Sequence, residues 1–269
     1  MLNLNQTKLW DFWIDRGGTF TDIVARDPNG ELFTDKLLSE NKQLYKDAGL
    51  AGIKRFLKVP HDEKIPTDNI NSIKMGTTVA TNALLERKGF PVVLLTTKGL
   101  RDQLRIAYQN RPNLFDRQII LNDPLYDHIV EVEERVTSSG KILQPINKEK
   151  LYEDLRKIKN VEEKSCAIVF MHSCKFNKHE KEAEEVAKAI GFSHISLSYR
   201  TSQIMKYVMR GDTTVADAYL SPVLNKYIEN LYSEFNGDIS GKISFMQSNG
   251  GLTDASLFSG KDSILSGPA

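Results

Sequence analysis

Three short strand-like runs at the start of the chain constrain its fold more than any other feature. The runs cover residues 9–15, 21–26 and 31–38. Turn-forming sequences separate them, Gly17-Gly18 after the first and Asp27-Pro28-Asn29-Gly30 after the second. Strands joined by such short turns pair in an antiparallel manner, because a parallel pair needs a long crossover between its strands. We therefore expect an antiparallel meander at one edge of a sheet.

After this meander, helical and strand-like segments alternate along the chain. Helices are expected at residues 41–57, 79–87, 148–159, 178–190 and 213–235, and a loop and a helix share 98–108. Strands are expected at 71–75, 91–97, 129–136, 165–170 and 242–246. A further helix, 201–209, should break near Gly211, and Pro222 should bend or restart the long helix. The alternation is typical of an α/β fold with a largely parallel sheet.

Composition narrows the class of protein. With 269 residues and 40% hydrophobic content, the chain can bury the core of one large domain or two smaller ones. The net charge is +1, which favours neither nucleic acid nor a membrane surface as a partner. Residues 1–11 contain no apolar signal segment, and no run of about 18 apolar residues occurs, so we expect a cytoplasmic protein.

The two cysteines, Cys166 and Cys174, exclude a disulfide framework. Cys166 lies in an apolar run and should be a buried thiol. His172, Cys174 and His179 follow closely, but their spacing fits no zinc pattern, and the end of a strand is the simpler interpretation.

The segment DRGGTFTD, residues 15–22, lies between the first two expected strands. Gly17 and Gly18 carry no Cβ, so their backbone N–H groups can approach an anion closely. A plain hairpin with a tight Gly-Gly turn is the alternative. The polar residues on both sides of the glycines favour phosphate binding.

Those flanking residues supply further oxygen groups. Thr19 and Thr21 offer hydroxyl donors, and Asp15, at the end of the first strand, can hold a hydrated Mg²⁺. Asp22 completes the expected nucleotide site. No Gly-Lys-Ser/Thr follows and no helix follows the glycines, so the segment is neither a Walker loop nor a dinucleotide-binding fingerprint.

A second candidate segment is MGTTVATN, residues 75–82. Here a strand ends, a glycine turns the chain, and Thr77 and Thr78 open a helix whose N-terminal N–H groups attract an anion or a polarised carbonyl. The simpler interpretation is that Thr77 or Thr78 caps the helix. Capping and ligand binding can coexist.

A third candidate segment, residues 101–112, is rich in groups that bind carboxylates and amides: Arg105, Tyr108, Asn110 and Arg111. The alternative is a solvated helix end with an Asp102–Arg105 pair three residues apart. Spacing alone favours this alternative.

Many longer motifs give these segments a context. They are WIDRGGTFTD at 13–22, KLLSEN at 36–41, MGTTVATNALLER at 75–87, YQNRP at 108–112, GDTT at 211–214, AYLSP at 218–222, MQSNGG at 246–251 and LSGPA at 265–269. In this order they resemble the hydantoinase A/oxoprolinase family, most closely its 5-oxoprolinases. The resemblance runs from about Trp10 to Ala269, which is nearly the whole chain.

The resemblance implies a fold and a domain organisation. The fold is an actin/Hsp70-like (ribonuclease H-like) ATPase lobe with an inserted α/β subdomain. Residues 1–200 would be the N-terminal domain with the phosphate clip, and residues 201–269 the truncated start of the hydantoinase A domain. Family members continue into a second glycine-rich phosphate motif, a nucleoside pocket and a hydrolase half or subunit. That half is the implied partner, and a homo-oligomer is compatible with the resemblance.

The resemblance also implies an activity, ATP- and Mg²⁺-dependent hydrolysis of 5-oxo-L-proline to L-glutamate in glutathione metabolism. Asp15 would be the catalytic and metal-binding residue, and the Gly17–Thr19 turn would hold phosphate. Arg105 is the first candidate for the substrate carboxylate, because hydantoinase relatives tend to carry an acidic residue there. The alternatives are an ATP-dependent hydantoinase or other cyclic-amide hydrolase, a small-molecule kinase of the same fold, and a non-catalytic lobe that binds nucleotide or a partner chain.

Overall fold

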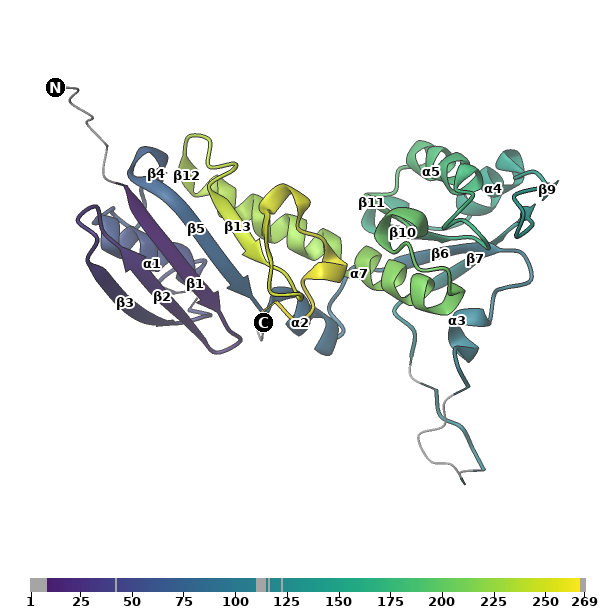
Figure 1. Cartoon of the computed structure of the whole chain (residues 1–269), viewed down its shortest axis with the longest axis horizontal. Coiled ribbons are helices and arrows are strands. Elements are labelled where there is room, and N and C mark those ends of the chain that lie inside the picture. Colours follow the sequence, from purple (N-terminus) through teal and green to yellow (C-terminus); the bar gives the residue numbers. More distant parts are fainter. Residues whose placement is uncertain (1–8, 42, 110–114, 116, 122, 267–269) are drawn as a thin grey trace. The chain divides into compact units, whose positions relative to one another are not determined.

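The computed structural model describes residues 9–41, 43–109, 115, 117–121 and 123–266. The chain forms two compact units (Figure 1). The first unit combines residues 1–88 with 223–269, and the second consists of residues 89–222.

A six-stranded mixed sheet forms the centre of the first unit, in the order β14-β13-β5-β1-β2-β3. The strands are β1 (Trp10–Arg16), β2 (Phe20–Arg26), β3 (Leu32–Leu38), β5 (Ile70–Thr77), β13 (Ile243–Met246) and β14 (Leu252–Asp254). β1, β2 and β3 pair as the antiparallel meander that the sequence predicts, and it lies at one edge of the sheet. β5 is parallel to both β1 and β13, while β14 is antiparallel to β13.

One face of this sheet is buried beneath helices. Helix α1 (Ala48–Leu57) packs against β1, β2 and β3, and Tyr227 of α7 (Tyr207–Ser233) contacts Phe245 of β13. A Cβ on Gly52 would lie 2.0 Å from the Ile23 side chain, so glycine allows α1 to approach β2 this closely. On the other face, Asp15, Asp22 and Val24 stay exposed, because successive strand residues point to opposite sides.

The remaining elements of the first unit are short. Strands β4 (Ile65–Pro66) and β12 (Phe235–Asn236) pair in parallel, helix α2 (Val79–Leu85) follows β5, and three 3₁₀ turns cover Thr67–Asn69, Ala255–Leu257 and Gly260–Asp262.

The second unit contains a four-stranded parallel sheet in the order β11-β10-β6-β7. Its strands are β6 (Val92–Thr97), β7 (His128–Val132), β10 (Ser165–Val169) and β11 (His194–Leu197); its helices are α3 (Gln103–Ile106), α4 (Lys148–Leu155), α5 (Lys178–Ile190) and α6 (Ser198–Thr201); β8 (Arg135–Val136) and β9 (Ile142–Gln144) form a hairpin. Every residue of β6 and β10 is buried, as expected of central parallel strands.

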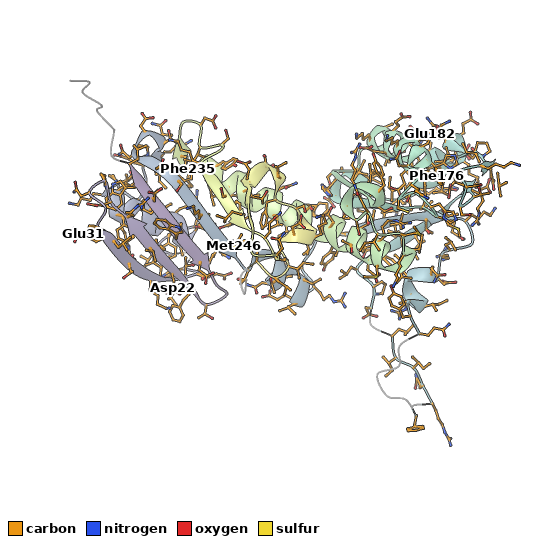
Figure 2. All side chains as sticks on the ribbon, in the orientation of Figure 1. Asp22, Glu31, Phe176, Glu182, Phe235 and Met246 are labelled. Atoms are coloured by element: carbon orange, nitrogen blue, oxygen red, sulfur yellow. The ribbon has the colours of Figure 1, made fainter. Side chains whose placement is uncertain are left out.

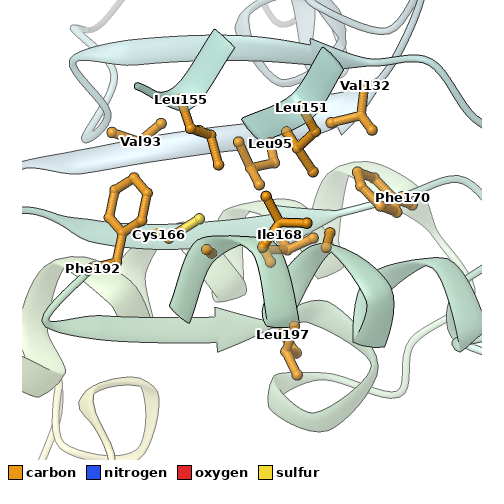
Figure 3. Close-up of a cluster of buried hydrophobic side chains, with 13 residues drawn as sticks. Val93, Leu95, Val132, Leu151, Leu155, Cys166, Ile168, Phe170, Phe192 and Leu197 are labelled. Carbon is orange, nitrogen blue, oxygen red and sulfur yellow. The ribbon is translucent and has the colours of Figure 1, made fainter. Parts of the chain in front are cut away.

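The core of this unit lies between the sheet and helices α4 and α5, where Leu95, Ile168, Leu151 and Leu155 pack together (Figure 3). Cys166 belongs to this core and is fully buried, as the sequence predicts. Burial raises the pKa of its thiol well above the usual range.

The α/β prediction is confirmed, and residues 89–222 form an α/β unit inserted between the two segments of the first unit. The expected domain boundary at residue 200 coincides with neither junction between the compact units, which lie after residues 88 and 222. That boundary stays a prediction about the family's regions.

The expected break near Gly211 is wrong. Helix α7 runs without interruption through both Gly211 and Pro222. Gly211 serves packing instead, because a Cβ there would lie 2.5 Å from the Leu104 side chain. A proline inside a helix costs about 3 kcal/mol, but each buried large apolar side chain contributes roughly 1.5–3 kcal/mol. Buried Val215, Leu220 and Leu224 offset the cost.

Other expected elements are shorter than predicted or are divided. Helix 41–57 begins only at Ala48, because the Asp47 carboxylate accepts the Leu50 N–H and caps the helix there. The helix expected within 98–108 is limited to α3, and strand 129–136 is divided into β7 and β8. None of the helices in the described part of the chain combines the length and the apolar character needed to cross a membrane.

Candidate functional site

The turn between β1 and β2 is tight. The Gly17 N–H donates to the Phe20 carbonyl at 3.0 Å, which closes the hairpin. A Cβ on Gly17 would lie 2.8 Å from that same oxygen, so a larger residue would have to displace the backbone. The structure thus contains the tight hairpin that the simpler interpretation of this segment requires.

Ser39, which directly follows β3, supports the turn from behind. Its N–H donates to the Thr19 carbonyl at 2.8 Å, and its Oγ donates to the Gly17 carbonyl at 2.7 Å. The hydroxyls of Ser39 and Thr21 are 2.9 Å apart, and both residues are buried. Thr21 therefore contacts Ser39 rather than solvent.

The outer side of the turn is left available. Gly18 and Thr19 are exposed, and in the described part of the chain no hydrogen bond engages their N–H groups. The Gly17 and Thr19 carbonyls accept hydrogen bonds from Ser39, whereas the Gly18 and Thr19 amides remain available, which is the arrangement an anion requires.

Asp15 is the last residue of β1 whose side chain lies on the exposed face of the sheet, and it lies beside this turn. It lies directly opposite Asp22 on β2, and no ion pair joins Asp15 to any residue that the structure describes. Asp22 instead pairs with Lys36, 2.7 Å from its carboxylate. Burial, and secondly the negative charge of Asp22, raise the pKa of Asp15.

A pocket of about 300 Å³ adjoins Asp15 on the open face of the sheet. Its other lining residues include Trp13, Lys74, Gly76 and Met246. Asp22 and Met246 are labelled in Figure 2, on β2 and β13. Gly76 is the register partner of Asp15 on β5, and a Cβ there would lie 3.3 Å from the Asp15 carboxylate. The glycine therefore leaves room for that carboxylate.

The second predicted segment lies beside the turn. The Thr78 N–H and Oγ1 both donate to the Arg16 carbonyl, at 3.1 and 3.2 Å. A Cβ on Gly18 would lie 3.6 Å from the Asn82 amide nitrogen, so the start of α2 contacts the turn directly. Thr77 is buried, and its Oγ1 accepts the Val79 N–H at 3.2 Å. Thr78 is the N-cap residue of α2, but its side chain makes no capping hydrogen bond.

Thr77 and Thr78 lie in the same unit as the turn, whereas the substrate residues proposed from the third segment lie in the other unit. Arg105, on α3, donates to the Leu121 carbonyl at 3.4 Å, and Tyr108 is exposed. Asn110 and Arg111 lie outside the described residues. The structure therefore unites Asp15, the turn and Thr78 within one unit, but it does not relate them to Arg105 or Tyr108.

Sequence reasoning missed Ser39, Lys74 and Asn82. Ser39 and Asn82 stand within quoted motifs, but a motif does not tell which of its side chains faces the turn. Among the described residues, no group of three or more His, Cys, Asp or Glu side chains could by itself hold a metal ion, at residues 172–179 or elsewhere. A metal at Asp15 would need oxygen ligands from a bound phosphate and water as well.

Comparison with protein families gives two matches. Residues 11–191 match the hydantoinase/oxoprolinase N-terminal region, and residues 210–269 match the hydantoinase/oxoprolinase family model that follows it.

Curated relatives include 5-oxoprolinase 1 of Arabidopsis thaliana, 42% identical over 96% of this chain and 22% of that protein. The 5-oxoprolinase of Saccharomyces cerevisiae is 41% identical over 95% of this chain and 23% of that protein. The chain thus spans less than a quarter of the length of these relatives.

Two solved structures share the fold. ATP-dependent caprolactamase from Pseudomonas jessenii superposes with a TM-score of 0.77 and 27% identity, covering 96% of this chain and 38% of that chain. The nucleotide-free structure of acetone carboxylase gives a TM-score of 0.75 at 20% identity, covering 96% of this chain and 39% of that chain, which indicates a common fold alone.

Proposed function

Because this chain belongs to the hydantoinase/oxoprolinase family, we propose that it is the nucleotide-handling N-terminal part of an ATP-dependent 5-oxoprolinase. The observation that carries the proposal is the Gly17–Thr19 turn beside Asp15. Among the residues that the structure describes, no hydrogen bond engages the Gly18 and Thr19 N–H groups, and no ion pair engages the Asp15 carboxylate. A turn of this kind receives phosphate oxygens through its amides, and the carboxylate faces the cation that accompanies them.

In this proposal the Gly18 and Thr19 amides bind phosphate oxygens of ATP, and Thr21 acts through Ser39 by holding the turn in shape. Asp15 would hold Mg²⁺ directly or through water, and Mg²⁺ would neutralise charge on the phosphates. The donor chemistry fits, because Mg²⁺ in nucleotide sites takes one or two carboxylates together with phosphate oxygens and water. Asp22 keeps Lys36 beside the site.

The reaction that this site would serve begins on a resonance-stabilised lactam. The lactam oxygen attacks the γ-phosphorus of ATP and ADP leaves, which gives an activated ring carbon. Water then adds to that carbon, and the C–N bond opens as the nitrogen takes up a proton, which leaves an acyl phosphate. A second water hydrolyses the acyl phosphate to the carboxylate and inorganic phosphate. The protein mainly positions the reactants and stabilises charge.

5-Oxoproline is the proposed substrate, and Thr77, Thr78, Arg105, Tyr108, Asn110 and Arg111 remain the proposed substrate residues. The assignment is supported by 42% identity to a 5-oxoprolinase, against 29% to the caprolactamase alpha subunit of Pseudomonas jessenii. The same proposal assigns the chain to the cytoplasm and to glutathione metabolism, with the rest of a longer 5-oxoprolinase as its partner.

Two experiments test the proposal. Calorimetric titration of the 269-residue chain with ATP and Mg²⁺ should detect binding. A chimera in which this chain replaces the matching segment of the Saccharomyces cerevisiae enzyme should form glutamate and ADP from 5-oxoproline and ATP. Transfer of phosphate to a hydroxyl substrate, without hydrolysis, would identify a kinase instead. A chimera that folds but is inactive toward 5-oxoproline and active toward hydantoin would contradict the substrate assignment.

A further inference from the structure

Arg16 directly follows Asp15 but points to the opposite, helix-covered face of the sheet. Its side chain is only 14% exposed. The Nε atom lies 3.4 Å from the Asp47 carboxylate, and the guanidinium carbon lies 5.6 Å from the centre of the Tyr227 ring. An arginine is thus held between a helix cap on α1 and an aromatic ring on α7, directly behind the turn.

Stability alone does not account for this arrangement. A buried ion pair is often no more stabilising than apolar residues of similar size, because both charges lose their water. The Arg16 Nε hydrogen-bonds to no residue that the structure describes, which adds to the cost. The contacts do, however, specify geometry, because they fix the direction in which β1 enters the turn.

The backbone of Arg16 is in direct contact with the site. Its carbonyl accepts both hydrogen bonds from Thr78, and the next residue, Gly17, begins the turn. Asp47 is itself held, because its other oxygen accepts the Leu50 N–H at 3.0 Å. The Arg16 side chain therefore connects the turn to α1 and α7. The Arg16 backbone carbonyl connects the turn to Thr78, at the start of α2.

We propose that Arg16 is a positioning residue, whose contacts with Asp47 and Tyr227 set the Gly17–Thr19 amides and Thr78 at the spacing that a phosphate group requires. This role rests on the proposed function, because it concerns the same site. Arg16 does not touch the nucleotide; it acts through the turn that does.

The chain contains a matched control for this proposal. Arg26, on β2, pairs with Asp11 at 2.6 Å and lies over the Trp13 ring at 5.6 Å, so it repeats the arginine–carboxylate–aromatic arrangement. It lies at the end of the hairpin away from the turn, because Arg26 pairs with Asp11 whereas Thr21 pairs with Arg16. Its loss should affect stability without affecting the turn.

The test compares Arg16→Met, Arg16→Lys, Asp47→Asn and Arg26→Met in the 269-residue chain. Affinity for ATP with Mg²⁺ is measured by calorimetry, Tm by circular dichroism, and local order by hydrogen exchange. The reporter amides are those of Gly17, Ser39 and Thr78, whose hydrogen bonds brace the turn. Asp47→Asn isolates the charge, because asparagine caps helices as well as aspartate does.

We expect Arg16→Met to weaken ATP binding by about tenfold, since small displacements in a site have large effects, and to speed exchange at all three amides. Arg16→Lys should recover part of the affinity, because lysine keeps the charge but not the planar group. Arg26→Met should lower Tm while leaving affinity and the three amides unchanged. Asp47→Asn should follow Arg16→Met in direction, with a smaller effect.

Two results would overturn the proposal. The first is an equal loss of affinity in Arg16→Met and Arg26→Met at equal loss of Tm, which would make the effect one of overall stability. The second is unchanged exchange at the three amides in Arg16→Met. The exchange measurement needs no ligand. If the wild-type chain failed to bind ATP while Arg16→Met still loosened these amides, the proposed function would fail and the positioning role of Arg16 would stand.

Discussion

Asp15 and Asp22 lie directly opposite each other on β1 and β2, so two carboxylates share one exposed edge of the turn. Lys36 neutralises Asp22 alone. No described residue forms an ion pair with Asp15, and burial together with the charge of Asp22 raises the pKa of Asp15. A cation bound with phosphate would relieve this repulsion, which links the electrostatics of the free chain to the proposed chemistry.

The first prediction concerns the role of Asp15 in catalysis. In the chimeric 5-oxoprolinase, Asp15→Ala should nearly abolish 5-oxoproline-dependent ATP cleavage, because the proposed Mg²⁺ loses its carboxylate. The matched control is Asp35→Ala, which removes a carboxylate on β3 that pairs with Arg55 of α1. This variant should stay active. A near-wild-type kcat in Asp15→Ala would show that the segment is only a turn.

The second prediction follows from the raised pKa of Asp15. The pKa of Asp15 is 3.8 in the unfolded chain and higher in the folded chain, so between these two values the folded chain binds more protons. The free energy of unfolding therefore falls as the pH rises through this window, and ionised Asp15 destabilises the fold above it. Asp15→Asn should therefore raise the urea midpoint at neutral pH, and the gain should disappear as the pH falls below the window. The effect should be small, because the carboxylate is only partly buried and solvent screens its charge.

Asp22→Asn provides the check on this explanation. Removing the charge of Asp22 should lower the pKa of Asp15, which NMR titration of the Asp15 carboxyl carbon measures. If burial were the sole cause of the raised pKa, the pKa would not change. Added Mg²⁺ and ATP should stabilise the wild-type chain more than Asp15→Asn.

A third prediction compares two adjacent glycines. Gly17→Ala should destabilise the chain, because its Cβ would lie 2.8 Å from the Phe20 carbonyl. Gly18→Ala should not, because its nearest neighbour would be the Asn82 amide at an ordinary 3.6 Å. Thermal unfolding of the two variants measures the difference, and equal Tm values would contradict the tight-turn geometry.

The fourth prediction concerns the isolated chain, which should show little or no ATPase activity. Phosphoryl transfer needs charge stabilisation on both sides of the γ-phosphate, and the chain spans only 22–23% of the 5-oxoprolinases that it matches. A coupled assay for ADP tests this. Robust turnover stimulated by 5-oxoproline would show that residues 1–269 already contain a complete site.

The fifth prediction concerns substrate choice. 5-Oxoproline carries a carboxylate that hydantoin and caprolactam lack, and an arginine can pair with it through two hydrogen bonds. Arg105→Ala in the chimera should lower kcat/KM for 5-oxoproline by roughly 10- to 150-fold, the equivalent of about 1.5–3 kcal/mol, with ATP affinity little changed. Arg101→Ala, an exposed neighbour, is the control. Intact kinetics in Arg105→Ala would make Arg105 a surface charge.

The sequence by itself determined the features that depend on neighbouring residues. The meander, the Gly17-Gly18 turn and the buried strands β6 and β10 follow from short-range patterns of apolar residues and glycines, and the structure contains all of them. The order of the motifs was specific enough to indicate the family.

Only the tertiary structure decided what lies behind the turn. Ser39 reaches the Gly17 carbonyl across 22 residues of chain, Thr78 reaches Arg16 across 62, and Tyr227 comes from a helix near the other end. Local propensity contains no information on such contacts, because they form only when the sheet and its helices pack. The same reason explains α7, where the burial of apolar side chains outweighs the local preference of Gly211 and Pro222 to end a helix.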